Sequence, residues 1–97
     1  QAAAANADWS VPGYYVVLVE QPGDESWPIT GASFILVHKE NKDATVTKAM
    51  LEFFDWSFKH GASTAMELDY VPIPENVYNM IENTWKEDVR AGGKSVW

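Results

Sequence analysis

Apolar residues in the middle of the chain recur at helical spacing, which predicts an amphipathic helix over residues 43–60. Asp43 precedes this stretch as a predicted N-cap. Lys59 and His60 suit the carbonyl end of the helix dipole, and Gly61 predicts the C′ position. The residues of the predicted apolar face are Val46, Ala49, Met50, Phe53, Phe54, Ser57 and Phe58. On the opposite side, Asp55 and Lys59 have the spacing of an ion pair.

A second helix is predicted over residues 75–90, because an apolar side chain returns at every fourth position. These side chains are Val77, Ile81, Trp85 and Val89. Their burial would dock the helix onto a sheet, and Gly92-Gly93 would end it. Residues 62–68 could add one or two helical turns, and the alanines at positions 2–5 are typical of the end of a helix.

Two stretches in the first half of the chain are rich in β-branched and aromatic residues, and we predict strands over residues 14–20 and 29–38. Phe34 to Val37 is an unbroken apolar run, typical of a strand covered on both faces. Gly31 indicates a bulge or a close approach of another backbone. A covered strand followed at once by an amphipathic helix predicts an α/β fold.

Composition narrows the possible partners. The chain has 97 residues with 14 acidic and 7 basic side chains, giving a formal net charge of -7. Nucleic-acid binding needs clustered Lys and Arg, so this balance argues against it. The absence of cysteine excludes disulfides and thiolate metal sites. Because the chain starts at Gln1 without a methionine, we expect it to be a fragment or a processed product.

Each candidate catalytic or metal-binding group is better explained by an ordinary structural role than by chemistry. Residues 92–95 (Gly-Gly-Lys-Ser) resemble the end of a P-loop, but Asp88 stands where that motif needs glycine. His38 and His60 lack the spacing of a metal-binding pair. Paired acids such as Glu67 and Asp69 lie in polar segments, where solvated charge is the common case.

The aromatic residues between positions 53 and 58 could line a ligand pocket, although aromatics at helical spacing more often form core. We therefore predict no catalytic residue, no phosphate-binding residue and no metal site in this chain. We also predict no cofactor and no enzymatic activity.

Three runs of residues, in this order and spacing, carry a resemblance to a known family. They are Trp27-Pro28-Ile29-Thr30, Phe53-Phe54-Asp55-Trp56 and Leu68-Asp69-Tyr70-Val71-Pro72-Ile73-Pro74. With them the chain closely resembles the C-terminal third of bacterial periplasmic phosphate-binding proteins, the receptors of the high-affinity phosphate ABC transporter. The likeness covers nearly the whole chain. It departs from the family at Ala44-Thr45, where a proline is common.

The resemblance implies the C-terminal portion of a two-lobed periplasmic binding protein (type II) fold. Residues 1–26 would end the second lobe, residues 27–34 would cross between the lobes, and residues 35–97 would form the C-terminal part of the first. It implies a periplasmic, secreted or cell-surface location and inorganic phosphate as the ligand of the intact protein. The implied partners are the N-terminal remainder of the same protein and the membrane permease. The family's phosphate contacts lie in that remainder, so none is carried over.

Two interpretations stay open. In the first, the chain is a structural and hinge part of such a receptor, and alone it exposes apolar surface along residues 35–37 and the aromatic helix face. It would then form a homodimer, exchange elements or associate with the remainder. In the second, it is a stand-alone α/β protein-interaction module with its apolar residues in its own core. Asp43 and Glu75 at the two helix starts would repel phosphate, so we expect no phosphate binding by the chain alone.

Overall fold

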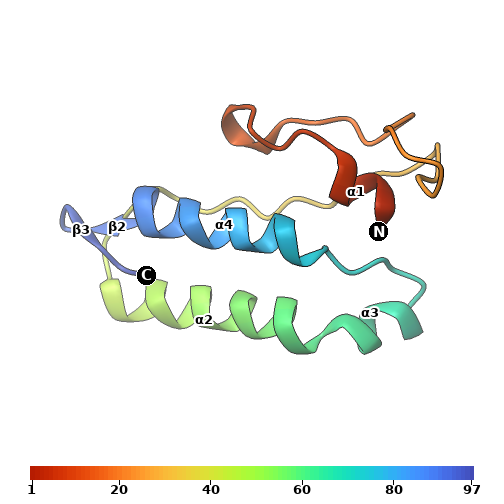
Figure 1. Cartoon of the computed structure of the whole chain (residues 1–97). Coiled ribbons are helices and arrows are strands. Elements are labelled where there is room, and N and C mark those ends of the chain that lie inside the picture. The colour runs from red at the N-terminus through yellow and green to blue at the C-terminus, as the bar shows by residue number, and fades with distance from the viewer.

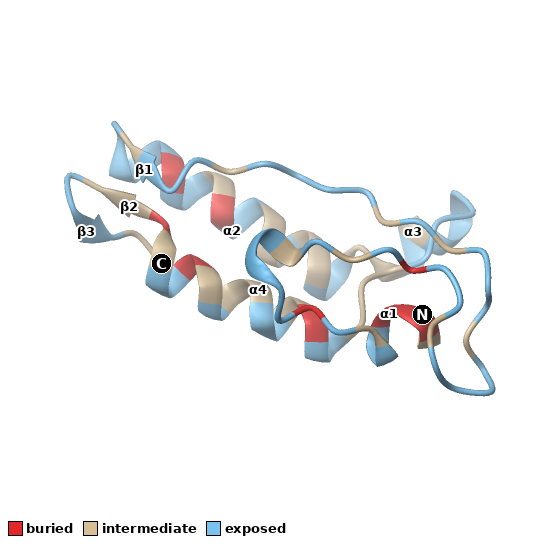
Figure 2. Ribbon diagram, turned by 90° about the horizontal axis from the view of Figure 1, so that it is seen from above, coloured by how far each residue is buried: buried red, intermediate tan, exposed pale blue.

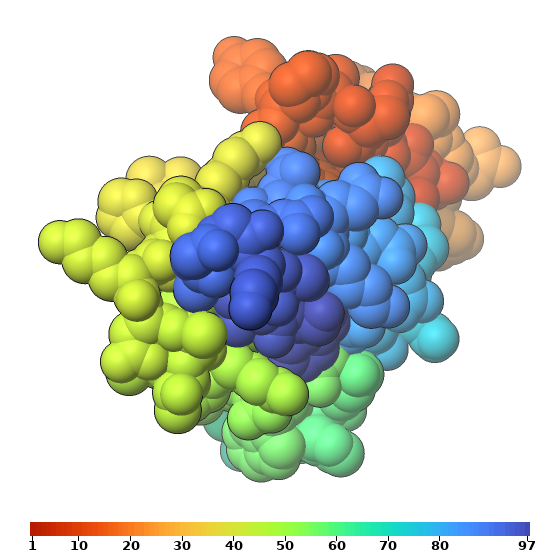
Figure 3. All heavy atoms as spheres, turned by 90° about the vertical axis from the view of Figure 1, so that its left-hand side faces the viewer, coloured from red at the N-terminus to blue at the C-terminus, as the bar shows by residue number.

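The computed structural model describes residues 1–97. The elements, in chain order, are α1 (Ala2–Asn6), the 3-10 turn η1 (Pro12–Tyr14), β1 (Glu40–Asn41), α2 (Ala44–His60), α3 (Ala62–Glu67), α4 (Glu75–Asp88), β2 (Arg90–Ala91) and β3 (Lys94–Ser95). Helices α2 and α4 run side by side in opposite directions, and the N-terminal residues lie on the far side of α4 (Figures 1 and 3). The molecule is flat, measuring 45 × 29 × 17 Å.

Helix α2 begins and ends close to where the sequence predicts. The Asp43 carboxylate accepts hydrogen bonds from the backbone N–H groups of Thr45 (2.9 Å) and Val46 (3.0 Å), which confirms the N-cap. At the other end Gly61 has φ −88°, so it is not the left-handed C′ residue that we predicted. Glycine is required there for another reason, because a Cβ atom would lie 2.5 Å from the carbonyl oxygen of Ser57.

The buried face of α2 differs from the predicted one. Leu51 is fully buried and Thr47 nearly so, whereas Val46 is 65% and Phe53 62% exposed. The prediction was wrong in part, because the apolar stripe of α2 is wider than the surface that covers it. Met50, Phe54 and Phe58 lie partly buried against the C-terminal cluster with Leu51, whereas the other edge of the stripe is exposed.

Helix α4 confirms the predicted apolar face, with Val77, Trp85 and Val89 buried and Ile81 partly buried. The helix ends at Asp88, two residues before the predicted end, and Arg90 belongs to β2. It does not dock onto a sheet as expected. Instead, it lies between α2 and the N-terminal residues (Figure 1). The further helical turns predicted over residues 62–68 are present as α3.

The predicted strands over residues 14–20 and 29–38 are absent. A strand is defined by hydrogen bonds to a neighbouring strand, and these residues have almost none; Glu20 N–H donates to Pro28 C=O at 3.0 Å. The run from Phe34 to Leu36, expected to be covered on both faces, is more than half exposed. Gly31 forms no bulge, and a Cβ atom there would meet open space.

The sheet that does form is small and lies at one end of the helix pair (Figure 1). β1 pairs with β2 in parallel, with Glu40 opposite Arg90, and β2 pairs with β3 in antiparallel. Gly92 and Gly93 connect β2 to β3, with φ values of 59° and 74°. Two successive positive φ values are those of a type I′ hairpin turn, which explains the glycine pair.

Two clusters of buried side chains form the core, which comprises few of the residues (Figure 2). The N-terminal cluster consists of Ala4, Trp9, Leu18 and Val77. The C-terminal cluster consists of Leu51, Trp85 and Val89. Ile81 packs against both. The chain is therefore an α/β structure with a mixed sheet, and its division at residues 26 and 34 into parts of two lobes stays a prediction.

Candidate functional site

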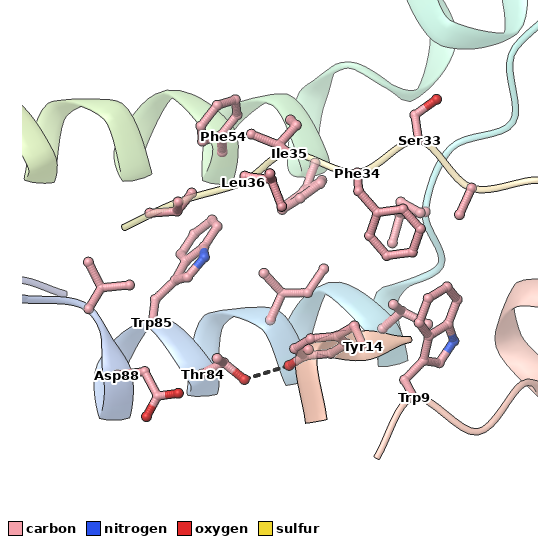
Figure 4. A pocket seen from close by; sticks show the side chains of 18 of the residues that line it. Trp9, Tyr14, Ser33, Phe34, Ile35, Leu36, Phe54, Thr84, Trp85 and Asp88 are labelled. Atoms are coloured by element: carbon pink, nitrogen blue, oxygen red, sulfur yellow. Dashed lines mark hydrogen bonds between the residues drawn. The ribbon is translucent and has the colours of Figure 1, made fainter. Parts of the chain in front are cut away.

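An apolar groove of about 280 Å³ lies between extended residues 32–37 and the helices α2 and α4 (Figure 4). Phe54 and Phe58 of α2 and Val77, Ile81 and Trp85 of α4 contribute to its lining. Trp9 and Tyr14 from the N-terminal residues complete it. The extended residues therefore form one wall of a cavity whose other walls come from three separate parts of the chain.

Extended residues 32–37 are attached to the molecule at their two ends. Ala32 packs against the N-terminal cluster and Val37 against the C-terminal cluster. Between these anchors, Phe34 is 54% exposed and Leu36 is 94% exposed. In Figure 4, Phe34 points from the chain toward Trp9, and Ile35 points the opposite way. This alternation is that of an extended strand.

Tyr14 holds the N-terminal residues against α4. Its hydroxyl hydrogen-bonds the backbone oxygen of Met80 at 2.8 Å and the hydroxyl of Thr84 at 2.5 Å (Figure 4). The backbone of Tyr14 has φ 56°, a value that residues other than glycine adopt rarely. It follows Gly13, which has φ 76°. The turn thus directs the phenol toward α4 and fixes one wall of the groove.

Charged groups lie at the edge of the groove and add little binding chemistry. Lys39 Nζ lies 2.9 Å from Asp88 Oδ2, and both side chains are largely exposed. An exposed pair of this kind contributes little to stability. The remaining lining is mostly apolar, and an oxyanion needs N–H donors or cations directed at it. The groove therefore suits apolar side chains better than a phosphate ion.

An ion cluster and stacked aromatic rings join α2 to α4. Lys59 Nζ lies 2.5 Å from Asp55 Oδ1 and 3.3 Å from Glu82 Oε1, which confirms the predicted Asp55–Lys59 pair. The hydrogen bond from Lys59 lowers the pKa of Asp55, and the same bond raises the pKa of Lys59. The Phe58 ring stacks against both Tyr78 and Trp85.

No family model matches this chain. Its sequence is 52% identical over 98 residues to the phosphate-binding protein PstS of Pasteurella multocida, across 99% of this chain and 28% of that protein. PstS of Haemophilus influenzae is 47% identical over 90 residues, and PstS of Xylella fastidiosa strain 9a5c is 46% identical over 90 residues. This chain is homologous to the C-terminal part of PstS. It spans about a quarter of the length of these PstS relatives.

The three runs that carry the likeness to the PstS family lie mostly at the surface of this chain. Trp27 is 72% exposed in a loop, where its backbone oxygen accepts from the Thr30 hydroxyl. Phe53 and Trp56 are on the uncovered side of α2. Tyr70 and Val71, in the link between α3 and α4, are also exposed. Apolar residues characteristic of the family therefore lack a covering surface within these 97 residues.

The remaining candidate residues are not brought together into a site. His60 lies against Trp56, with ring centroids 5.7 Å apart, and His38 lies at the exposed chain before β1. Lys94 and Ser95 form β3 and not a P-loop. The chain has no group of three or more His, Cys, Asp or Glu side chains that could hold a metal ion. None of its helices is both long enough and apolar enough to cross a membrane.

Sequence reasoning did not find the groove. It identified Phe34 to Val37 as apolar and extended and predicted a strand covered on both faces. The first interpretation, in which the chain alone exposes residues 35–37, agrees with the exposure of Ile35 and Leu36. The aromatic residues between positions 53 and 58 were interpreted as core, with pocket lining as the alternative. Phe54 and Phe58 are partly buried and also line the groove, whereas Phe53 and Trp56 are exposed. The signal that was available is the excess of apolar residues over what 97 residues can bury.

Proposed function

We propose that this chain is the C-terminal structural part of a periplasmic receptor that captures inorganic phosphate for an ABC transporter. Its homology to the C-terminal part of PstS supports this role. In the intact receptor, residues 27–34 would cross between the lobes and residues 35–97 would belong to the first lobe. The partners would be the N-terminal remainder of the receptor and the membrane permease, with no nucleic acid involved.

The observation that carries this proposal is the large surface of the chain. Its accessible area is 7045 Å² for 10.9 kDa, whereas a compact monomer of that mass exposes about 5600 Å². Its radius of gyration is 14.7 Å, against about 12.5 Å for a compact domain of this length. Nine of the 97 residues are buried. A stand-alone interaction module would bury its apolar residues, so this surface favours part of a larger protein.

The structure also supports the proposal that this chain, without the rest of the receptor, does not bind phosphate. Helix N-termini bind anions through free N–H groups, but the Asp43 carboxylate already accepts from two such groups at the start of α2. Glu75 lies in the first turn of α4. The guanidinium of Arg90 donates to the backbone oxygen of Glu87, three residues away. The phosphate contacts would therefore come from the rest of the receptor.

Calorimetric titration with inorganic phosphate tests this role on the intact receptor and on the 97-residue chain. We expect saturable binding by the intact receptor and no saturable heat from the chain alone. Sulfate serves as the control oxyanion for both. Saturable phosphate binding by the isolated chain would overturn the scaffold role, and an intact receptor without phosphate binding would overturn the receptor function itself.

A further inference from the structure

The hydrogen bonds between residues 1–26 and residues 35–97 all end on helix α4. One of them joins the side chain of Asn76, in the first turn of α4, to the backbone oxygen of Ala5, with Nδ2 donating at 3.2 Å. The others come from the hydroxyl of Tyr14. The N-terminal residues are therefore held to the rest of the chain by polar contacts with a single helix.

The Tyr14 hydroxyl is the polar centre of this contact. It donates its only proton to the Met80 C=O at 2.8 Å, so its oxygen accepts from the Thr84 hydroxyl at 2.5 Å (Figure 4). The φ of 56° at Tyr14 is a strained value that persists only where the surroundings hold the residue in place. The two hydrogen bonds to α4 supply part of that restraint.

The apolar part of the contact is the N-terminal cluster, in which Val77 is the one buried side chain from α4. Val77 is 1% exposed and packs among Ala4, Trp9 and Leu18. Trp9 Nε1 donates to the backbone oxygen of Ala4 at 2.7 Å, which ties the N-terminal residues to one another. These residues therefore meet α4 as one unit, with a buried apolar centre and the Tyr14 hydrogen bonds at its edge.

The Tyr14 contact lies well away from the start of the crossing between the lobes that we propose for residues 27–34. The loop over residues 20–28, drawn in orange in Figure 1, lies beyond the first turn of α4, whereas η1 with Tyr14 lies over the middle of that helix (Figures 1 and 2). A rotation about the beginning of the crossing would move Tyr14 farther than it moves residues next to the crossing. The Tyr14 hydrogen bonds are therefore sensitive to the relative orientation of the two parts.

We propose that Tyr14 forms a latch between the two lobes of the intact receptor and strengthens phosphate binding without touching phosphate. The inference rests on the proposed function, with residues 1–26 as the end of the second lobe and α4 in the first. Two-lobed binding proteins close around their ligand by rotation about a hinge. Hydrogen bonds that form between lobes only on closure raise the share of closed receptor and thereby the apparent affinity for the ligand. Tyr14 is thus a positioning residue.

Calorimetric titration of the intact receptor with inorganic phosphate tests the latch. Tyr14→Phe keeps the ring and removes the hydroxyl, and it should raise the Kd for phosphate about 5-fold, as expected for lost hydrogen bonds. Thr84→Val should also raise the Kd, and the double variant should bind about as tightly as Tyr14→Phe alone, because both changes break the same network. Tyr15→Phe is the matched control, because the neighbouring Tyr15 is 75% exposed, and it should leave the Kd unchanged.

The outcomes separate the latch from the receptor function. An unmodified intact receptor that binds no phosphate would overturn the receptor function. Phosphate binding by the unmodified receptor, with the same Kd for Tyr14→Phe, would overturn the latch and leave the receptor function standing. Thermal unfolding of the phosphate-free variants identifies a merely structural role, since Tyr14→Phe would then lower the melting temperature with no change in Kd. An equal rise in Kd for Tyr15→Phe would also contradict the latch.

Discussion

Leu51 and Phe53 lie two residues apart on α2 and have opposite surroundings. The Leu51 side chain is fully buried in the C-terminal cluster, whereas Phe53 faces solvent. By size and hydrophobicity alone, Phe53 would be expected to contribute more to the core. Its position on the helix determines the outcome, because burial depends on whether another element covers that side.

Leu51→Ala should lower the free energy of unfolding by about 2–5 kcal/mol, because it leaves a cavity between α2 and α4. Phe53→Ala is the matched control and should change it by roughly 0.5 kcal/mol or less, as surface substitutions do. Chemical denaturation of each variant measures both values. Equal losses would contradict the observed orientation of α2.

Asp55→Asn should remove part of the acid sensitivity of the fold. Lys59 holds the pKa of Asp55 below its ordinary value of 3.8. The unfolded state therefore binds more protons than the folded state between these two pKa values. The pair stabilises the fold fully above pH 3.8, and this stabilisation is lost as the pH falls through the lowered pKa.

The difference in stability between the unmodified chain and Asp55→Asn should therefore shrink on acidification, as followed by urea unfolding at a series of pH values. Asp24→Asn, in an exposed loop, is the control and should leave the pH profile unchanged. A constant difference at all pH values would show that Asp55 acts through packing and not through its charge.

At the scale of the elements, helices and strands differ in how far their sequences specify them. Each helix satisfies its backbone hydrogen bonds among residues three or four positions apart. The bounds predicted for α2 and α4, residues 43–60 and 75–90, agree with the structure to within two residues. The two predicted strands failed because their hydrogen bonds must come from another segment, and no segment pairs with them along their length.

The start of α2 offers a test of an element that local sequence specifies. Asp43→Ala should cost about 1 kcal/mol of stability, because two N–H groups of the first turn lose their acceptor. Asp43→Asn retains a side-chain acceptor and should lower the stability by only a few tenths of a kcal/mol. Thermal unfolding followed by circular dichroism compares the two. Similar losses for both variants would assign the effect to the charge of Asp43 and not to the cap.

At the scale of the whole molecule, the main feature is apolar surface that no part of the chain covers. The smallest dimension of the molecule is 17 Å, little more than one layer of helices. Exposed apolar residues occur along the groove, on the outer side of α2 and in the loop after α3. Monomers rarely expose apolar surface on this scale unless it forms an interface.

The isolated chain should therefore bind an apolar fluorescent dye such as ANS, and the intact receptor should bind much less of it. Replacing both Ile35 and Leu36 by Ser should reduce the dye fluorescence of the isolated chain. The double replacement of Asp24 and Glu25 by Ser, in an exposed polar loop, serves as the control and should not reduce it. Equal dye binding by the chain and the receptor would contradict the idea that the remainder covers this surface.

The sequence alone determined the two long helices, the Asp43 cap, the Asp55–Lys59 pair and the homology to PstS, because each depends on residues close together in the chain or on their linear order. Only the tertiary structure decided which side of α2 is buried, that residues 14–20 and 29–38 form no strand, and that a groove lies beneath Phe34. These features depend on what lies beside each segment, and a strand or an apolar face has no defined partner until distant parts of the chain are placed against it.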